Sequence, residues 1–374
     1  MRIKSLSSAR VTAGVAAAAT ALLLAGVPAS AAPTATTTTP ATPLHIFAVD
    51  LGTLPGGTSS QATSVNDSGT VVGFSTNASG TQFAVRWVGA GTSAGLIINL
   101  GALPGYTRSS ADGINNNGTI VGESDSNQGV GIATQWEPNG TIVNLGTLAG
   151  YTYSAAAEID SSGAVAGSVY NLGGAFRAAR WSPSGTITNL GTLPGGSSSQ
   201  AEGINDSGVV VGYSSAAGGQ LTAVRWAPNG QIVQLPIPSI FTGSIAESVN
   251  AQGVVVGRVQ NSIGQYFAAR WAPNGSFALL GGLPGYTDSD PSAINYYGLA
   301  VGEVTSSSGQ VAAATLWAPS GSAFNLGGLP GTSYAGAAAI SSQGAIVGWS
   351  ETAAGQIHAV RWILPSATLT ALGN

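Results

Sequence analysis

Three carboxylate residues occupy the same position of a recurring pattern, two places before an apolar residue that is followed by Asn: Asp112, Glu202 and Glu247. Two carboxyl groups a few ångströms apart can carry out glycoside hydrolysis. If the strand that bears these residues is the innermost of its sheet, they approach a central channel, where they could act in catalysis or ligand binding. The structural alternative is that they bond turn amides or an arginine of the third strand.

A second position changes in size and charge from one copy of the pattern to the next. It directly follows a glycine that every copy keeps, and it holds Phe74, Glu123, Ser168, Tyr213, Arg258, Glu303 and Trp349. Because the fold does not fix this position, we expect it to face solvent or a ligand, and we take Phe74, Tyr213, Arg258 and Trp349 as candidate binding residues.

Three tyrosines follow a Pro-Gly or Ala-Gly turn between copies: Tyr106, Tyr151 and Tyr286. Exposed aromatic rings at such places can stack on sugar rings. The alternative is that they pack within their loops.

Other catalytic chemistry finds little support. The sequence has no cysteine and two histidines, His45 and His358, which argues against a Cys nucleophile and a His-rich metal site. No Gly-x-Ser-x-Gly nucleophile elbow is present between a strand and a helix. We therefore expect no catalytic residue, no metal and no cofactor.

The elements that position these residues come from a repeat of 45 to 49 residues. A Leu-Gly pair or its degenerate form recurs at Leu51, Leu100, Leu145, Leu190, Leu235, Leu280, Leu326 and Leu372. Seven units result, and each contains four short β segments separated by turn residues.

Each unit carries three fixed features. A turn that opens with Asn, Asp or Ser closes on glycine, as at Gly69 and Gly208, which predicts a tight hairpin with a left-handed glycine. A second glycine lies inside the next strand and predicts close approach of neighbouring backbones. The third segment ends in tryptophan, which we expect to pack between units, and the Arg that precedes five of these tryptophans should bond turn carbonyls or the Asn and Asp column of a neighbour.

Four antiparallel strands in about 45 residues are typical of a propeller blade. We predict an all-β fold, a seven-bladed β-propeller of four-stranded antiparallel blades over residues 45–374, with a β-solenoid as the alternative. Ring closure requires one terminal segment to complete the last blade. Both 45–52 (HIFAVDLG) and 367–373 (ATLTALG) resemble fourth strands, and the sequence does not choose between them.

The joint pattern of LGTLPGG, then Ala-x-x-Ile-Asn-x-x-Gly-x-Val-Val-Gly-x-Ser, then an aromatic-rich third strand resembles the probable extracellular repeat of the HAF family, found in secreted bacterial proteins. The resemblance covers residues 45–374 and implies an extracellular repeat protein. The family's His-Ala-Phe triplet is altered in this chain, where only His358-Ala359-Val360 keeps the histidine.

Residues 1–31 have the pattern of a secretory signal peptide, with a basic start, an apolar stretch and Ala29-Ser30-Ala31 before the predicted cleavage. Residues 32–44 read as a disordered Thr/Pro-rich spacer. Cleavage leaves eight arginines, no lysine and fifteen acidic residues, a formal charge of −7. This balance argues against nucleic acid and anionic membranes as partners.

We therefore expect a secreted, monomeric, non-catalytic propeller that binds an extracellular glycan, a cell-envelope polymer or a protein. A polysaccharide-active enzyme that uses channel carboxylates is one alternative, and a purely structural extracellular protein is another.

Overall fold

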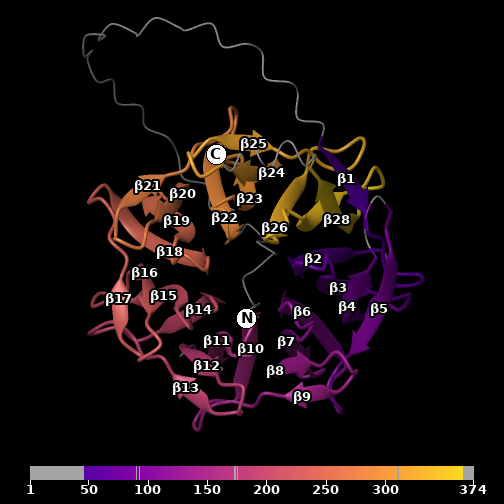
Figure 1. Cartoon of the computed structure of the whole chain (residues 1–374), viewed down its shortest axis with the longest axis horizontal. Helices are drawn as coiled ribbons and strands as arrows, with labels where there is room; N and C mark the ends of the chain where they lie inside the picture. Colours follow the sequence, from indigo (N-terminus) through magenta and orange to yellow (C-terminus); the bar gives the residue numbers. More distant parts are fainter. Residues whose placement is uncertain are drawn as a thin grey trace, which may run out of the picture.

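The computed structural model describes residues 46–364, apart from 90, 92, 172, 173, 175 and 310. Its described residues form twenty-eight strands in seven four-stranded antiparallel sheets, which surround a central axis as blades (Figure 1). The predicted seven-bladed propeller is confirmed, and the solenoid alternative is wrong. Within the described part of the chain, no helix is long and apolar enough to cross a membrane.

Within each blade, the strands run from the innermost to the outermost in chain order, except that β1 is the outermost strand of blade 7. Blade 1 comprises β2 (Ser60–Val65), β3 (Val71–Thr76), β4 (Gln82–Val88) and β5 (Leu96–Gly101). Blade 2 comprises β6 (Arg108–Ile114), β7 (Ile120–Asp125), β8 (Gly131–Trp136) and β9 (Ile142–Asn144). Blade 3 comprises β10 (Tyr153–Ile159), β11 (Val165–Tyr170), β12 (Phe176–Trp181) and β13 (Ile187–Asn189). Blade 4 comprises β14 (Ser199–Ile204), β15 (Val210–Ser215), β16 (Leu221–Trp226) and β17 (Ile232–Gln234).

The remaining three blades follow the same order. Blade 5 comprises β18 (Phe241–Val249), β19 (Val255–Asn261), β20 (Tyr266–Trp271) and β21 (Phe277–Leu279). Blade 6 comprises β22 (Asp288–Ile294), β23 (Ala300–Thr305), β24 (Ala312–Trp317) and β25 (Ala323–Asn325). Blade 7 comprises β26 (Ala335–Ile340), β27 (Ile346–Glu351), β28 (Ile357–Ile363) and β1 (Phe47–Asp50).

The N-terminal strand closes the ring. β1 pairs antiparallel with β28, so that Ala48 lies opposite Trp362, and the Leu51 amide donates to the Ala359 carbonyl at 2.9 Å. Of the two segments that the sequence left open, 45–52 therefore supplies the missing fourth strand. The other segment, 367–373, lies outside the described residues.

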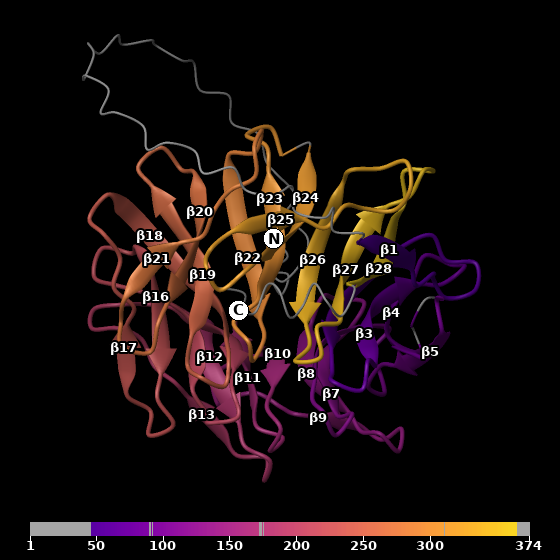
Figure 2. The same cartoon turned by 45° about the horizontal axis from the view of Figure 1, so that its top comes forward.

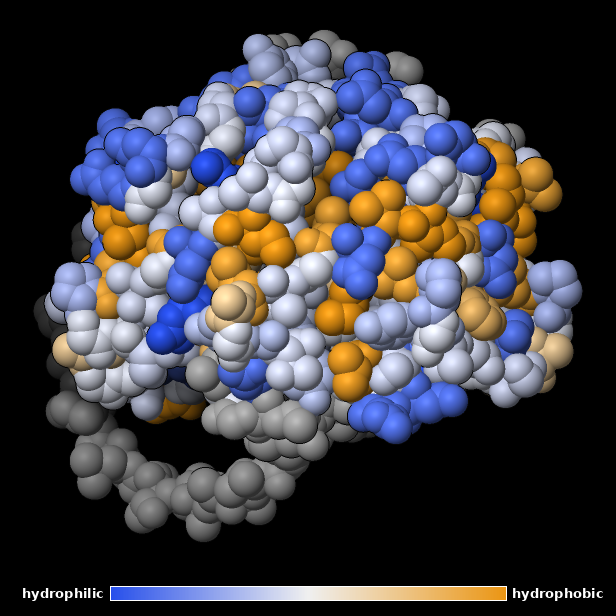
Figure 3. All heavy atoms as spheres, turned by 90° about the horizontal axis from the view of Figure 1, so that it is seen from below, coloured by the Kyte–Doolittle hydropathy of each residue, from blue (hydrophilic) through white to orange (hydrophobic). Residues whose placement is uncertain are grey.

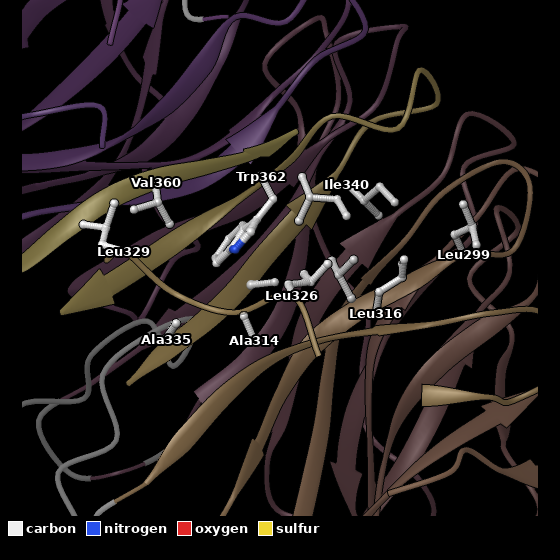
Figure 4. Close-up of a cluster of buried hydrophobic side chains, with 12 residues drawn as sticks. Leu299, Ala314, Leu316, Leu326, Leu329, Ala335, Ile340, Val360 and Trp362 are labelled. Carbon is white, nitrogen blue, oxygen red and sulfur yellow. The ribbon is translucent and has the colours of Figure 1, made fainter. Parts of the chain in front are cut away.

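The blades pack through one tryptophan each, as predicted. All seven are at most 2% exposed: Trp87, Trp136, Trp181, Trp226, Trp271, Trp317 and Trp362. In the cluster between blades 6 and 7, Trp362 lies among aliphatic side chains that include Leu326 and Ile340 (Figure 4), and its indole N–H donates to the Gly327 carbonyl at 3.0 Å. The same tryptophan-centred packing recurs between the other blades. It holds the innermost strand of each blade next to the central axis (Figure 2).

Hydrogen bonds between turns connect neighbouring blades near the axis. Asn115 Nδ2 donates to the Asp160 carbonyl at 3.1 Å, and Asn205 Nδ2 donates to the Asn250 carbonyl at 2.9 Å. A carboxylate cannot donate, so the link from Asp160 to blade 4 is made instead by the Ser161 amide, which donates to Asp206 Oδ1 at 2.9 Å. The sequence predicted that the Arg before the blade tryptophan bonds turn carbonyls or the Asn and Asp column of a neighbouring blade. Arg270 confirms this prediction, because its Nη1 donates to the Pro319 carbonyl of the next blade at 2.9 Å.

Candidate functional site

A β-bulge in every innermost strand builds the wall of the central channel. The register of each strand shifts by one residue at the same place, for example between Ala201 and Gly203 on β14. The extra residues at the seven bulges are Thr63, Asp112, Ala157, Glu202, Glu247, Ser292 and Ala338. All seven line a single cavity of about 740 Å³.

The conserved place of a glycine on the second strand of each blade is explained by its contact with the innermost strand beside this bulge. A Cβ atom at Gly212 would lie 2.0 Å from the Gln200 carbonyl oxygen, and the corresponding glycines of the other blades are equally close to a backbone oxygen of the innermost strand. Only glycine tolerates such an approach. The predicted backbone contact is therefore confirmed. The turn glycines, such as Gly69 at a φ of +81°, also adopt the predicted left-handed conformation.

The cavity gathers much of the charge of a weakly charged protein. Only 7% of the residues are charged, and fifteen are acidic. Seven of those fifteen line the cavity, namely Asp112, Glu158, Glu202, Glu247, Asp288, Asp290 and Glu303. Among the described residues that line it, Arg258 is the one basic residue. The side of the ring seen in Figure 3 has a different character, with several separate groups of apolar side chains among polar ones.

The three carboxylates singled out from the sequence all line the cavity, as predicted for the innermost strands. Glu247 Oε1 lies 2.9 Å from Arg258 Nη1, and the same guanidinium nitrogen also contacts Asp290 Oδ2 at 2.5 Å. The cation that pairs with Glu247 is thus on the second strand of its own blade. The structural alternative gave these carboxylates an arginine of the third strand as one possible partner; Glu247 does pair with an arginine, but that arginine lies on the second strand, β19.

Burial and neighbouring charges shift the pKa values of Arg258 and Glu202 in this part of the channel. Burial would lower the pKa of Arg258, but Asp290 and Glu247 raise it above its ordinary value, so the guanidinium stays charged. Burial raises the pKa of Glu202 well above its usual range, and the neighbouring Glu247 raises it further, although Arg258 and Gln200 oppose the shift. The raised pKa of Glu202 favours its protonated form, next to the ion pairs that Arg258 makes with Glu247 and Asp290.

Two further acids, Glu123 on blade 2 and Glu158 on blade 3, interact with Asp112, and Glu158 of the two lines the cavity. Burial, helped by the charge of Asp112, raises the pKa of Glu158 to about 7. Burial also raises the pKa of Glu123, as do Asp125 and Asp112, and the Tyr170 hydroxyl donates to Glu123 Oε1 at 3.1 Å. The ring of Tyr170 stacks on that of Tyr153, with centroids 5.0 Å apart.

The variable column does not form a uniformly exposed rim. Trp349 and Arg258 line the cavity, and the Trp349 ring contacts the Tyr334 ring with centroids 4.9 Å apart. Tyr213 is 5% exposed and its hydroxyl donates to Gln200 Oε1 at 2.8 Å, so it packs beneath the wall. Phe74 is half-buried and is absent from the cavity lining.

The three loop tyrosines also lie away from the cavity lining. Tyr151 and Tyr286 pack against the hydrophobic clusters of blades 3 and 6, and Tyr106 is half-buried in its turn. Loop packing, the alternative interpretation, is what the structure shows for Tyr151 and Tyr286.

Sequence reasoning missed Glu158, Tyr170 and Tyr266 on the cavity wall. Glu158 follows the bulge residue of its strand, in a position where other blades carry Gly, Ser or Ala. Its presence as the one acid in that column was a signal that could have found it.

The cavity opens toward the hairpins between second and third strands. Ile263, Gly264 and Gln265 of the β19–β20 hairpin line it, as do Ser306, Ser307 and Gly309 of the β23–β24 hairpin. Ile263 is 77% exposed and marks this rim. The described residues hold no group of three or more His, Cys, Asp and Glu side chains arranged for a metal ion.

No protein-family model matches the sequence, and no curated protein matches it. Among solved structures, a streptogramin B lyase is similar at 11% identity and a TM-score of 0.54, covering 86% of this chain and 98% of the lyase. A virginiamycin B lyase from Staphylococcus aureus is similar at 13% identity and a TM-score of 0.54, covering 86% of this chain and 100% of the lyase. A TolB from Acinetobacter baumannii has 13% identity and a TM-score of 0.49, with 67% of this chain spanning 61% of TolB. Such low identities extend the similarity to the propeller fold and no further.

Proposed function

We propose that this protein is a secreted, non-catalytic propeller that binds a glycan in its central channel. The observation that carries the proposal is the concentration of seven carboxyl-bearing residues on one cavity wall in a chain whose residues are only 7% charged. Solubility alone would favour charges on the outer surface. Charges collected inside a hollow of about 740 Å³ are better explained by a polar ligand.

The wall combines the two kinds of group that saccharides use. Carboxylates can accept hydrogen bonds from sugar hydroxyls, and the amides of Gln61 and Gln200 can both accept and donate. Trp349, Tyr266 and Phe176 offer aromatic faces. Trp349 is packed against Tyr334, which limits its rotation and so lowers the entropic cost of stacking. These features support a glycan over a flat protein partner, because the ligand must enter a channel.

Secretion is the second part of the proposal, and it rests on the sequence of residues 1–31, outside the described residues. It agrees with the resemblance of residues 45–374 to the HAF family. We predict that the protein from culture supernatant begins at Ala32, because the small-residue pattern ends at Ala31. Intact-mass analysis checks this, and a membrane-bound chain that retains residues 1–31 would contradict it.

The binding proposal is tested by screening the purified protein against soluble glycans and cell-envelope polymers, with reducing-end release measured in the same samples. We expect at least one saccharide to bind without being cleaved, and Trp349→Ala to weaken that binding at least about tenfold. Tyr106→Ala is the matched control, since Tyr106 lies away from the cavity lining. Equal loss in both variants, or binding only to proteins, would contradict the glycan proposal.

A polysaccharide-active enzyme is the second candidate, and one observation favours it. Burial and Glu247 raise the pKa of Glu202, and Glu247 itself pairs with Arg258; glycosidases use a carboxyl of raised pKa as an acid beside a second carboxyl in a different environment. Release of reducing ends that is abolished by Glu202→Gln, with the fold intact, would establish this function in place of binding alone.

A further inference from the structure

A groove at the rim of the ring adjoins the central cavity. It has a volume of about 360 Å³ and lies between the turn before β26 and the hairpin that joins β27 to β28. We call it the rim groove, and its lining includes Gly331, Thr332, Tyr334, Glu351 and Ala353. Tyr334 also lines the central cavity, so the cavity and the groove meet at this tyrosine.

The residue type at one place in the turn before the innermost strand explains why blade 7 has this groove. In blades 1 and 4 that residue is glycine, and the turn lies against the end of the second strand. A Cβ atom at Gly57 would overlap the Thr76 carbonyl oxygen, and one at Gly196 would overlap the Ser215 carbonyl oxygen. In blade 7 the residue is Thr332, whose Cβ atom rules out such a close approach.

The four remaining blades carry an aromatic residue at the same place, namely Tyr106, Tyr151, Phe241 and Tyr286. Phe241 belongs to a hydrophobic cluster, and Tyr151 and Tyr286 pack against the clusters of their blades. Blade 7 therefore has neither the close turn that glycine allows nor a large ring to occupy the space. The rim groove lies in that space, between the turn and the hairpin.

The adjoining part of the channel wall presents an aromatic ring beside a carboxylate. Gly336 on β26 lies opposite Trp349 on β27, and a Cβ atom at Gly336 would be 2.8 Å from two atoms of the indole ring. The same Cβ atom would be 2.5 Å from Glu303 Oε2. Every other blade has a residue with a Cβ atom at this place. Glycine in blade 7 thus lets the indole and the Glu303 carboxylate both lie over the innermost strand.

Tyr334 connects this part of the wall to the rim groove. Its ring contacts the Trp349 ring, with centroids 4.9 Å apart. Burial raises the pKa of Tyr334, and Glu303 and Glu351 raise it further, so the hydroxyl stays neutral and can donate a hydrogen bond. Glu303 lines the cavity and Glu351 lines the groove. Sugar faces stack on aromatic rings and sugar hydroxyls donate to carboxylates, so this arrangement suits successive sugar residues.

We propose that the rim groove is a second sugar-binding subsite, and that the ligand is a linear, uncharged oligosaccharide that runs from the channel across Tyr334 into the groove. This inference rests on the proposed function and specifies the class of glycan. An acidic saccharide is disfavoured, because seven acidic residues line the cavity. Arg258, the one basic residue among the described residues of the lining, already pairs with Glu247 and Asp290.

The test is isothermal titration calorimetry with the dimer and the hexamer of four neutral glycans: cello-, manno-, xylo- and N-acetylchito-oligosaccharides. A dimer can occupy the channel alone, whereas a hexamer can also reach the groove. We expect at least one hexamer to bind at least about twentyfold more tightly than the dimer of the same sugar. Hexagalacturonic acid should bind at least about tenfold more weakly than that hexamer.

Two substitutions in one turn show whether the groove causes this length dependence. Ala353 and Ala354 are both exposed, but only Ala353 lines the groove, and neither lines the cavity. Ala353→Trp should fill the groove and weaken binding of the hexamer at least about tenfold, while its effect on the dimer stays below about twofold. Ala354→Trp is the matched control and should change both affinities by less than about twofold.

Thr332→Tyr is an independent variant, because it introduces the residue that blades 2, 3 and 6 carry at this place. It should also weaken binding of the hexamer at least about tenfold and leave the dimer unchanged within about twofold. Circular dichroism and the melting temperature verify that each variant is folded.

The outcomes separate this inference from the proposed function. Equal affinity for hexamer and dimer overturns the groove inference, as does hexamer binding that Ala353→Trp and Thr332→Tyr leave unchanged. Equal losses in Ala353→Trp and Ala354→Trp overturn it too. Tighter binding of hexagalacturonic acid than of every neutral hexamer contradicts the uncharged class.

Each of those results leaves glycan binding in the channel in place. The same holds if a glycan of the screen binds and none of the four neutral series does, which overturns the groove inference alone. If no glycan of the screen and no oligomer of the series binds, the proposed function itself is overturned.

Discussion

Glu158 shows how one buried residue couples the stability of this protein to pH. Its carboxyl sits between blades 2 and 3 with its pKa raised to about 7 by burial and by Asp112, so the folded chain holds a proton that the unfolded chain releases near pH 4.5. A group whose pKa rises on folding destabilises the folded state as pH increases through the window between the two values.

The first prediction follows from the upward direction of the Glu158 pKa shift. Between about pH 5 and 8, the unfolding free energy of the wild type should fall, and Glu158→Gln should remove about 3 kcal/mol of this fall, because Gln cannot ionise. Chemical denaturation at both pH values measures the difference. Glu137→Gln, on the turn after β8, is the control. Parallel pH profiles for wild type and Glu158→Gln would contradict the assignment.

A second prediction at this scale concerns the strand glycine. Gly212→Ala should destabilise the protein by about 3 kcal/mol or more, because its Cβ would lie 2.0 Å from the Gln200 carbonyl oxygen. Gly282→Ala serves as the comparison, since no atom lies within 4 Å of the Cβ position there, and it should change stability by less than about 1 kcal/mol. Similar melting temperatures for the two variants would mean that the bulge relaxes around the added methyl group.

At the scale of the element, the bulged innermost strand explains both what the sequence could predict and what it could not. The turn glycine, the strand glycine and the tryptophan recur in every unit, so the fold and the channel position of Glu202 followed from spacing. The bulge itself was hidden, because it changes register without changing residue type. Tyr213 was misjudged for a related reason: a variable position was taken as exposed, whereas its side chain is buried against Gln200.

The next prediction tests the role of strand β1 in closing the ring. Deletion of residues 45–52 should lower the melting temperature much more than deletion of 32–44, because the first removes β1, its pairing with β28 and Leu51, which is 2% exposed. Differential scanning calorimetry of both truncations makes the comparison. Equal melting temperatures would show that another segment can complete blade 7.

The whole molecule is a ring whose ends are joined by contacts distant in sequence. The Ser342 amide of blade 7 donates to Asp67 Oδ1 of blade 1 at 2.8 Å, and Asn116 Nδ2 of blade 2 donates to Asp67 Oδ2 at 2.9 Å. Seven rigid blades held in this way present seven bulge residues to one channel. The repeat fixes where these side chains point, and their differences from blade to blade make the channel wall polar and asymmetric.

The most direct test of the account is a crystal structure of the protein with the saccharide that binds most tightly in the screen. We predict that the sugar occupies the channel, with an aromatic contact to Trp349 and polar contacts to the bulge residues, Asp112 and Glu202 among them. A sugar bound at the opposite face, for example on the exposed Tyr296 and Tyr297, with the channel empty of it, would contradict the account.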